Sequence, residues 1–380
     1  MSQVNSMNST IRVGNLFGIP FYVHPSWFLV LGFVTWSYSR ALAKQFPQLG
    51  GGLPLLLGLM TALLLFSSVV AHELGHSFVA IRQKIDVKSI TLFIFGGLAN
   101  LEKESQTPAE AFWVAIADPI VSIILFAIAT TIDFVTATSG PLAAILSLLA
   151  SVNLTLALFN LIPGLPLDGG NILKALVWKI TGKSYKGVAV ASRIGQIFGW
   201  LVIASGVIPL LLFGSFINFW NLLIGFFLLQ NAGNAAQLAR VQEKLTGLTA
   251  ADAVTKDIPI VKADLSLREL ADQKLLNAQE YPRFLVTDEQ GQLLGAISVD
   301  NLQNIPNTLW AETPVSKAMQ PIEQSSTVPS DKPLLEVVQL LEKQKISALA
   351  VIRNNGFLVG ILEKTAIINL LQEKVQTKLA

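Results

Sequence analysis

Long apolar runs separated by short polar stretches dominate the first 240 positions of the chain. A membrane-spanning helix needs roughly 20 apolar residues to cross a hydrocarbon core of about 30 Å. The pattern contains about six such runs, and Gly199, Gly206 and Pro209 interrupt the fifth. The runs cover residues 25–43, 53–81, 112–135, 142–162, 196–213 and 216–236. This predicts a multi-pass α-helical membrane domain over residues 1–240.

Basic residues are distributed unevenly among the loops between these runs. Short loops rich in lysine and arginine stay on the cytoplasmic side of a membrane. The loops after the second and fourth runs are rich in such residues, whereas the loops assigned to the other side contribute Arg40 and Lys44. This distribution predicts that the N-terminus and the C-terminal region are both cytoplasmic.

Residues 87–98 break the pattern between the second and third runs. They alternate β-branched and aromatic residues with others, contain Gly96 and Gly97, and are too few to cross the membrane as a helix. We expect a β-hairpin or re-entrant segment embedded in the membrane. Because exposed strand edges are not tolerated in lipid, protein must cover this segment or it must line a wet cavity.

The composition changes abruptly after residue 236, where charged residues return and the long apolar runs stop. Residues 284–297 and 349–362 share one pattern of strand, glycine-containing turn and strand, displaced by 65 positions. Such self-similarity indicates an internal repeat. We therefore predict a soluble α/β domain over residues 245–375, built from repeats at about 245–308 and 312–372.

Composition narrows the chemistry further. Of the 380 residues, 52% are hydrophobic and 14% charged, which excludes a wholly soluble fold. The chain has no cysteine, so a metal would have to bind histidine, carboxylate or backbone oxygen. The net charge of +2 and the lack of a basic patch argue against a nucleic-acid partner.

The second apolar run contains the sequence His-Glu-Leu-Gly-His at residues 72–76. Histidines four residues apart share one helical face and can bind one Zn²⁺, and Glu73 can reach an attacking water as a general base. Ionisable groups inside a membrane are expensive and usually functional. The alternative is a chance match, or a pair of core histidines, His72 and His76, with satisfied hydrogen bonds.

A catalytic zinc site usually has three protein ligands. Asp168 follows the fourth run, on the same side of the membrane as the end of the second, and could supply the third ligand. Pro163 and Pro166 end the helix, while Gly169-Gly170 allow a close backbone turn. The alternative is that Asp168 begins an ordinary Asp-Gly turn.

Together, the His-Glu-Leu-Gly-His motif and the segment at residues 160–170 resemble the site-2 protease family of intramembrane zinc metalloproteases, peptidase M50-like. The C-terminal repeats resemble a cystathionine-β-synthase (CBS) pair, so the resemblance covers nearly the whole chain. It implies that His72, His76 and Asp168 bind one zinc ion. It also implies that Glu73 acts as base and later as acid, and that Asn160 polarises the scissile carbonyl or holds the substrate strand.

The resemblance also implies a substrate class and a biological role. Members of the family cleave membrane-anchored proteins within the membrane in regulated intramembrane proteolysis, for example an anti-sigma factor or a membrane-tethered transcription regulator. The location would be the cell membrane or an internal membrane such as the thylakoid. A strand near residues 93–99 could pair with an unwound substrate segment.

Three positions depart from the family pattern. Before Pro119 the family commonly has glycine, whereas this chain has Asp118. The polar residue that the family often has soon after this position is Ser122 here. The arginine that the family frequently has after Asp-Gly-Gly is Asn171 here. We expect Asp118 to lie at the membrane interface. We expect the same of His24, the third histidine of the chain. The alternatives for Asp118 are that it borders the water path or tunes the site.

In CBS pairs an acidic residue after each second strand often holds a nucleotide ribose. Asn301 and Ala366 occupy those positions here. The resemblance implies an adenine nucleotide as the ligand of the pair, but neither position is acidic, and the alternative is a packing or homodimerisation module. Further polar residues could surround a cleft. They are Thr287, Ser298, Asp300 and Glu363.

Two other classes of protein compete with an active protease. A transporter or channel regulated by a CBS pair would commonly show an internal repeat among its spans, and none is evident here. An inactive scaffold of the same fold is the other alternative, although every motif residue is intact.

Overall fold

A computed structural model of the chain describes residues 10–93, 96–214, 218–255, 260–274, 283–298, 305–322 and 326–376. The chain divides into two compact units, Met1–Arg240 and Val241–Ala380, each considered by itself. The candidate residues Asp300 and Asn301 lie outside the described residues.

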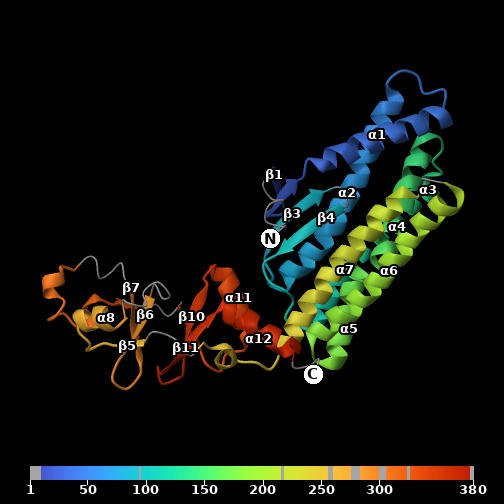
Figure 1. The fold of residues 1–380 in the computed structure, drawn as a ribbon. Helices are drawn as coiled ribbons and strands as arrows, with labels where there is room; N and C mark the ends of the chain where they lie inside the picture. Colours follow the sequence, from blue (N-terminus) through green and yellow to red (C-terminus); the bar gives the residue numbers. More distant parts are fainter. Residues whose placement is uncertain are drawn as a thin grey trace. The chain divides into compact units, whose positions relative to one another are not determined.

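Long apolar helices make up most of the first unit (Figure 1). They are α1 (Ser26–Gln45), α2 (Leu53–Arg82), α3 (Pro108–Thr136), α4 (Pro141–Asn160), α5 (Asp168–Thr181), α6 (Ser184–Phe213) and α7 (Phe219–Leu245). Among the described residues, four helices, α2, α3, α4 and α6, are long and apolar enough to cross a membrane. In the most apolar 18-residue window of each of these helices, at most 28% of the window is buried inside the protein, as lipid-facing helices require. The chain is an integral membrane protein.

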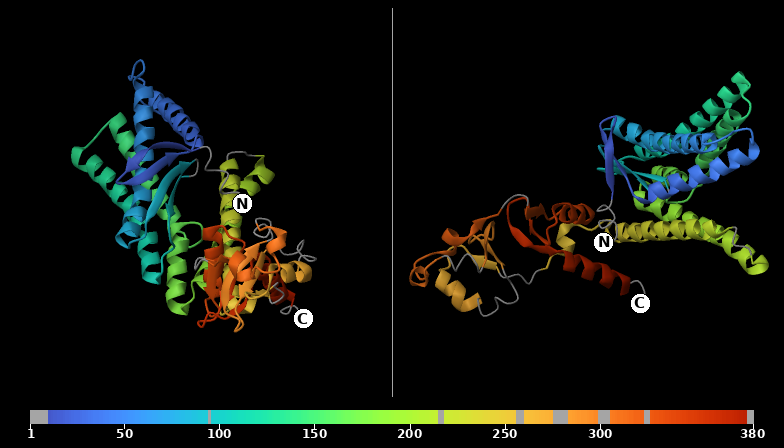
Figure 2. Two further views of the ribbon diagram at one scale, coloured as in Figure 1. Left: turned by 90° about the vertical axis from the view of Figure 1, so that its left-hand side faces the viewer. Right: turned by 90° about the horizontal axis from the view of Figure 1, so that it is seen from above.

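Two of the six predicted spans correspond to α1 and α7, which are helical but are not among those four. The count of six therefore stays a prediction. Helix α6 continues through Pro209, in the run where the sequence suggested an interruption. Helices α2, α3 and α4 pack against one another and form the frame of the unit (Figures 1 and 2).

A four-stranded sheet in the order β1-β2-β3-β4 lies against α2. Its strands are β1 (Ile11–Leu16), β2 (Ile19–Val23), β3 (Val87–Phe93) and β4 (Gly96–Leu101). Strands β3 and β4 are antiparallel, β2 and β3 are parallel, and β4 forms an edge of the sheet. Strands β1 and β2 were not predicted from the sequence. They are joined by Phe17 and Gly18, both at positive φ, as a two-residue hairpin turn requires.

The connection from α4 to α5 is folded tightly. An added Cβ at Gly169 would lie 2.3 Å from the Leu161 carbonyl oxygen, and one at Gly170 would lie 2.3 Å from the Leu165 nitrogen. Both glycines are thus needed because the loop passes close to the first turn of α5. Asp168 is the first residue of that helix, where the partial positive charge of the N-terminus favours a carboxylate.

The second unit contains two similar halves, in agreement with the predicted repeat. One sheet has the order β5-β6-β7-β8 and the other β11-β10-β9. The strands are β5 (Ile260–Lys262), β6 (Arg283–Thr287), β7 (Leu293–Ser298), β8 (Gln320–Pro321), β9 (Thr327–Pro329), β10 (Ala348–Ile352) and β11 (Leu358–Glu363). The helices are α8 (Leu267–Lys274), α10 (Val315–Ala318), α11 (Leu334–Gln344) and α12 (Lys364–Gln376). In each half a parallel strand precedes an antiparallel pair.

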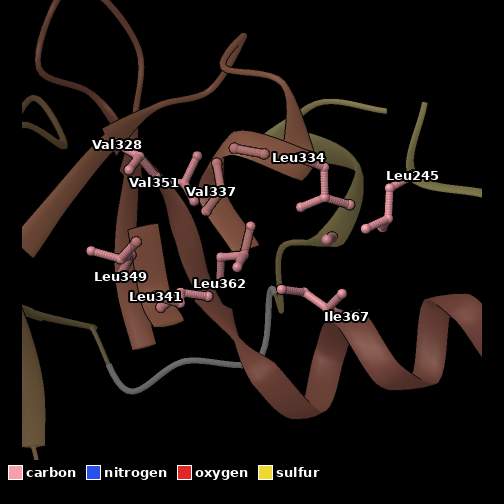
Figure 3. Close-up of a cluster of buried hydrophobic side chains, with 11 residues drawn as sticks. Leu245, Val328, Leu334, Val337, Leu341, Leu349, Val351, Leu362 and Ile367 are labelled. Atoms are coloured by element: carbon pink, nitrogen blue, oxygen red, sulfur yellow. The ribbon is translucent and has the colours of Figure 1, made fainter. Parts of the chain in front are cut away.

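Each half has its own apolar core. Leu341 of α11 packs with Leu349 and Val351 of β10 and Leu362 of β11 in the second half (Figure 3). Phe284 belongs to the corresponding cluster of the first half. These cores bury alternate strand residues against one helix face, which explains why the two halves share a pattern of apolar positions.

Candidate metal centre

The three ionisable residues of the motif lie on one stretch of α2, and two of them are largely hidden. His72 is 4% exposed and Glu73 is 9% exposed, while His76 lies one turn later on the same face as His72. They face a cavity of about 760 Å³. Residues of α1, α2, α3, α4, α5, α7, β3 and β4 line the cavity.

Helix α3 holds both imidazoles through their Nδ1 atoms. His76 Nδ1 lies 2.5 Å from the Val114 carbonyl oxygen, which can only accept, so Nδ1 carries the proton and donates it. His72 Nδ1 lies 2.8 Å from Ser122 Oγ. Fixing Nδ1 in this way directs Nε2 of each ring toward a shared point, as outer hydrogen bonds do for metal-binding histidines.

Asp168 approaches this point from the start of α5. Its Oδ1 lies 3.0 Å from His76 Nε2, and its Oδ2 lies 3.7 Å from His72 Nε2. Two donor atoms bound to a tetrahedral zinc ion at roughly 2.0–2.1 Å lie about 3.3 Å apart. The structure therefore brings His72, His76 and Asp168 together at separations that a zinc ion can bridge.

The donor set also fits zinc chemically. Two imidazole nitrogens and one carboxylate form a set found in catalytic zinc sites, which keep a further position for water. His72 and Asp168 belong to a group of three residues that could hold a metal ion, because one potential ligand atom from each lies within 4.8 Å of the other two. The third member of that group is Asp118.

Asp118 is where the structure departs from the sequence expectation. We expected it at the membrane interface, but it is 1% exposed and lies in the packed contact between α2 and α3. Its Oδ1 accepts a hydrogen bond from the backbone N–H of His76. Its Oδ2 lies 3.3 Å from His76 Nε2 and 3.8 Å from His72 Nε2. The interfacial interpretation is wrong because the packing of α3 against α2 carries this residue inward.

Strand β4 covers Glu73. An added Cβ at Gly97 would lie 2.2 Å from Glu73 Cγ, so a larger residue at this position would displace either the strand or the Glu73 side chain. The Ala99 backbone N–H also donates a hydrogen bond to the Glu73 carboxylate. The sequence pattern predicts a strand at Gly97 but no role for this residue, because the contact depends on how β4 packs against α2.

Asn160, the last residue of α4, also reaches the centre. Its Nδ2 donates a hydrogen bond to His72 Nε2 at 3.0 Å. His24 lies elsewhere: its Nδ1 lies 2.8 Å from Ser26 Oγ and accepts from the Ser26 backbone N–H at the start of α1. His24 is not among the residues that line the cavity.

Comparison with known proteins gives the family. The sequence model of peptidase family M50 matches residues 60–139 and 131–202, and the CBS-domain model matches residues 250–306 and 315–373. A Synechocystis protein named as a candidate zinc metalloprotease, sll0528, is 54% identical over 366 residues, which cover 96% of each chain. The chain belongs to peptidase family M50.

A more distant relative agrees with this assignment. The zinc metalloprotease MJ0392 of Methanocaldococcus jannaschii is 29% identical, over 95% of this chain and 96% of that protein. A solved structure of a site-2 protease from the same organism is 28% identical, covers 60% of this chain and 95% of its own, and superposes with a TM-score of 0.41. This M50 peptidase is a zinc metalloprotease with a C-terminal CBS pair.

Proposed function

We propose that this M50 peptidase hydrolyses peptide bonds within or near the membrane-spanning segments of membrane-anchored proteins. The observation that carries the proposal is the convergence of His72, His76 and Asp168 on one cavity inside a unit of apolar, outwardly exposed helices. A site placed there acts on chains that are themselves in the membrane. Anti-sigma factors and membrane-tethered transcription regulators are the substrate class we expect.

His72 Nε2, His76 Nε2 and the Asp168 carboxylate would hold the zinc ion. A bound zinc ion supplies Lewis-acid polarisation of the scissile carbonyl and activates a water molecule for attack. The Glu73 carboxylate accepts a proton from the attacking water and returns it to the leaving amine. The Ala99 N–H and the close backbone at Gly97 hold the Glu73 carboxylate in position.

Asn160 and β4 are proposed to position the substrate. The Asn160 amide lies beside His72, where it can donate to the carbonyl of the bond that is cleaved. Strand β4 is an edge strand, and Gly96, Gly97 and Ala99 line the cavity. An unwound substrate segment can add to such an edge by backbone hydrogen bonding.

Water must reach this membrane-embedded site. Lys174 and Glu104 both line the cavity and form an ion pair at 3.8 Å, in which Glu104 is largely exposed. These residues support a polar entry. With the positive-inside pattern, we place this entry, the N-terminus and the CBS pair on the cytoplasmic side.

The CBS pair is proposed to regulate cleavage, with an adenine nucleotide or a second copy of the chain as its ligand. Thr287, Ser298 and Glu363 each end a strand of this unit, and Ala366 lies in α12. Cleavage measured with and without adenine nucleotides, together with the mass of the detergent-solubilised protein, separates the two roles.

The decisive experiment measures zinc content and cleavage of a single-span substrate in detergent. The wild type should carry about one zinc ion per chain and cleave. Glu73→Ala should keep the metal and lose cleavage, whereas Asp168→Ala should lose both. Glu102→Ala, at an acidic residue outside the cavity lining, is the matched control and should behave as wild type. Wild-type cleavage by Glu73→Ala would refute the mechanism.

A further inference from the structure

The carboxylate of Asp118 has a buried oxygen that no hydrogen bond satisfies among the described residues. Among the described residues, Oδ2 has no hydrogen-bond partner, although the side chain is 1% exposed. Leaving a buried charged oxygen unpaired costs more than leaving a neutral group unpaired. A cation beside Oδ2 would remove that cost.

The position of this oxygen matches that of a metal ligand. Oδ2 lies 3.3 Å from His76 Nε2 and 3.8 Å from His72 Nε2. The corresponding distances from the Asp168 carboxylate to the two imidazoles are 3.0 Å and 3.7 Å. Asp118 approaches both histidines with the single atom Oδ2, whereas Asp168 approaches His76 with Oδ1 and His72 with Oδ2. Both carboxylates lie at separations close to the ~3.3 Å between ligands of a tetrahedral zinc ion.

The surrounding chain holds the side chain in this place. Oδ1 is fixed by the backbone N–H of His76, which leaves Oδ2 directed at the imidazoles. The close approach depends on Gly75, where an added Cβ would lie 2.6 Å from Asp118 Oδ1. The next residue, Pro119, lies in the same buried stretch of α3. The carboxylate is thus preorganised by two helices.

We propose that Asp118 is a fourth protein ligand of the zinc ion, beside His72, His76 and Asp168. This inference rests on the proposed metal site and adds a residue to it. Because a catalytic zinc ion needs a position for water, four protein ligands require either a fifth coordination position or release of Oδ2 when substrate binds. Oδ2 can leave while Oδ1 keeps its bond to the backbone.

Metal binding tests the proposal without relying on proteolysis. Full-length wild type and Asp118→Asn are compared for zinc affinity by chelator competition and for the visible spectrum of the Co²⁺-substituted protein. The amide oxygen that this substitution introduces can still accept from the His76 N–H, so the helix contact is retained. We expect zinc affinity to fall by more than the ~10–100-fold that loss of an outer-shell partner causes, and the Co²⁺ spectrum to change with the coordination sphere.

Three variants complete the design. Asp118→Gly removes the carboxylate altogether, so it provides a second test should Asp118→Asn fail to fold, and we expect the same loss. Asp168→Asn is the reference for a lost ligand. Asp133→Asn, on the same helix but outside the cavity lining, is the control and should match wild type.

The outcomes separate this inference from the proposed function. One outcome is that Asp168→Asn loses zinc, while Asp118→Asn keeps the wild-type Co²⁺ spectrum and its zinc affinity falls by 100-fold or less. Asp118 then only positions His76, and the inference is overturned. Unchanged affinity would mean that Asp118 is merely an ion-pair partner of protonated His76, which also overturns it. If the wild type itself binds no zinc, the metal site proposed above fails as well.

Discussion

The two units of this peptidase distribute polar and apolar side chains in opposite ways. In the CBS unit the core clusters consist of hydrophobic residues (Figure 3). In the membrane unit large hydrophobic side chains are exposed along the helices, as Leu211 is at 77%, whereas His72, Glu73 and Asp118 are buried. Among the described residues, buried apolar clusters occur in both units, but only in the membrane unit do large apolar side chains also cover the outward surface of the helices while ionisable side chains are buried.

Because of this difference, a buried polar residue in the membrane unit indicates a functional role. In a membrane unit the interior gains little from hydrophobicity, because lipid is as apolar as a leucine side chain. A carboxylate placed there is costly and needs a partner. The polar residues gathered inside the membrane unit thus identify its chemistry, and the apolar residues inside the CBS unit identify its stability.

The largest effect is expected when a core leucine is removed from the CBS unit. This substitution tests whether buried apolar residues stabilise that unit. Leu341→Ala deletes a side chain that is 1% exposed and should destabilise the unit by about 2–5 kcal/mol. Hydrogen exchange of peptides from residues 334–362 in the full-length protein measures the loss. Zinc content should not change.

The matched variant in the membrane unit is Leu211→Ala. Its side chain faces outward from α6, so we expect a change within about 0.5 kcal/mol. Equal destabilisation by the two substitutions would mean that outward apolar residues of α6 are packed against protein, and the comparison between the units would be wrong.

Gly97→Ala tests the covering of Glu73 by β4. The added Cβ would lie 2.2 Å from Glu73 Cγ, so either the strand or the carboxylate must move. A displacement of about 1 Å can cost ~100-fold in rate. We expect cleavage to fall to that degree with zinc content unchanged. Gly14→Ala, in the same sheet with no atom near the new Cβ, is the control.

Much of the site was predictable because its signals are local. The spacing of His72 and His76 determines that they share a helical face, and the glycines after Asp168 indicate a tight loop. The burial of Asp118 was not predictable, because it depends on the packing of α3 against α2. The role of Gly97 depends in the same way on contact between β4 and α2.

The same distinction between local signals and contacts between distant segments applies to the fold. Apolar runs predicted the long helices, since length and hydropathy are properties of a single segment. Strand β2 was missed because it pairs with β3, which lies more than 60 positions later in the chain, and β1, which pairs with β2, was missed with it. Helix α5 was missed as well, because an Asp-Gly-Gly sequence is as typical of a turn as of a helix start.

Ser122→Ala examines whether a polar partner inside the membrane unit tunes the metal. It removes the partner of His72 Nδ1, and loss of such an outer contact lowers metal affinity by ~10–100-fold. Chelator competition measures the change. Ser67→Ala removes an exposed hydroxyl that binds its own helix at Leu63, and should have no effect. Equal affinities in all three proteins would show that His72 is oriented without Ser122.

The smallest effect is expected at the surface of the CBS unit. The Glu269 carboxylate accepts hydrogen bonds from the backbone N–H and the hydroxyl of Ser266, and these bonds lower the pKa of Glu269 below its usual 4.5. A lowered pKa in the folded state stabilises the fold above pH 4.5, and that contribution is lost as the pH falls through the folded value. Glu269→Gln should therefore weaken hydrogen-exchange protection of residues 267–272 slightly at pH 7. The difference from wild type should shrink below pH 4.5, whereas a pH-independent difference would mean that the ionised carboxylate is not what stabilises the start of α8.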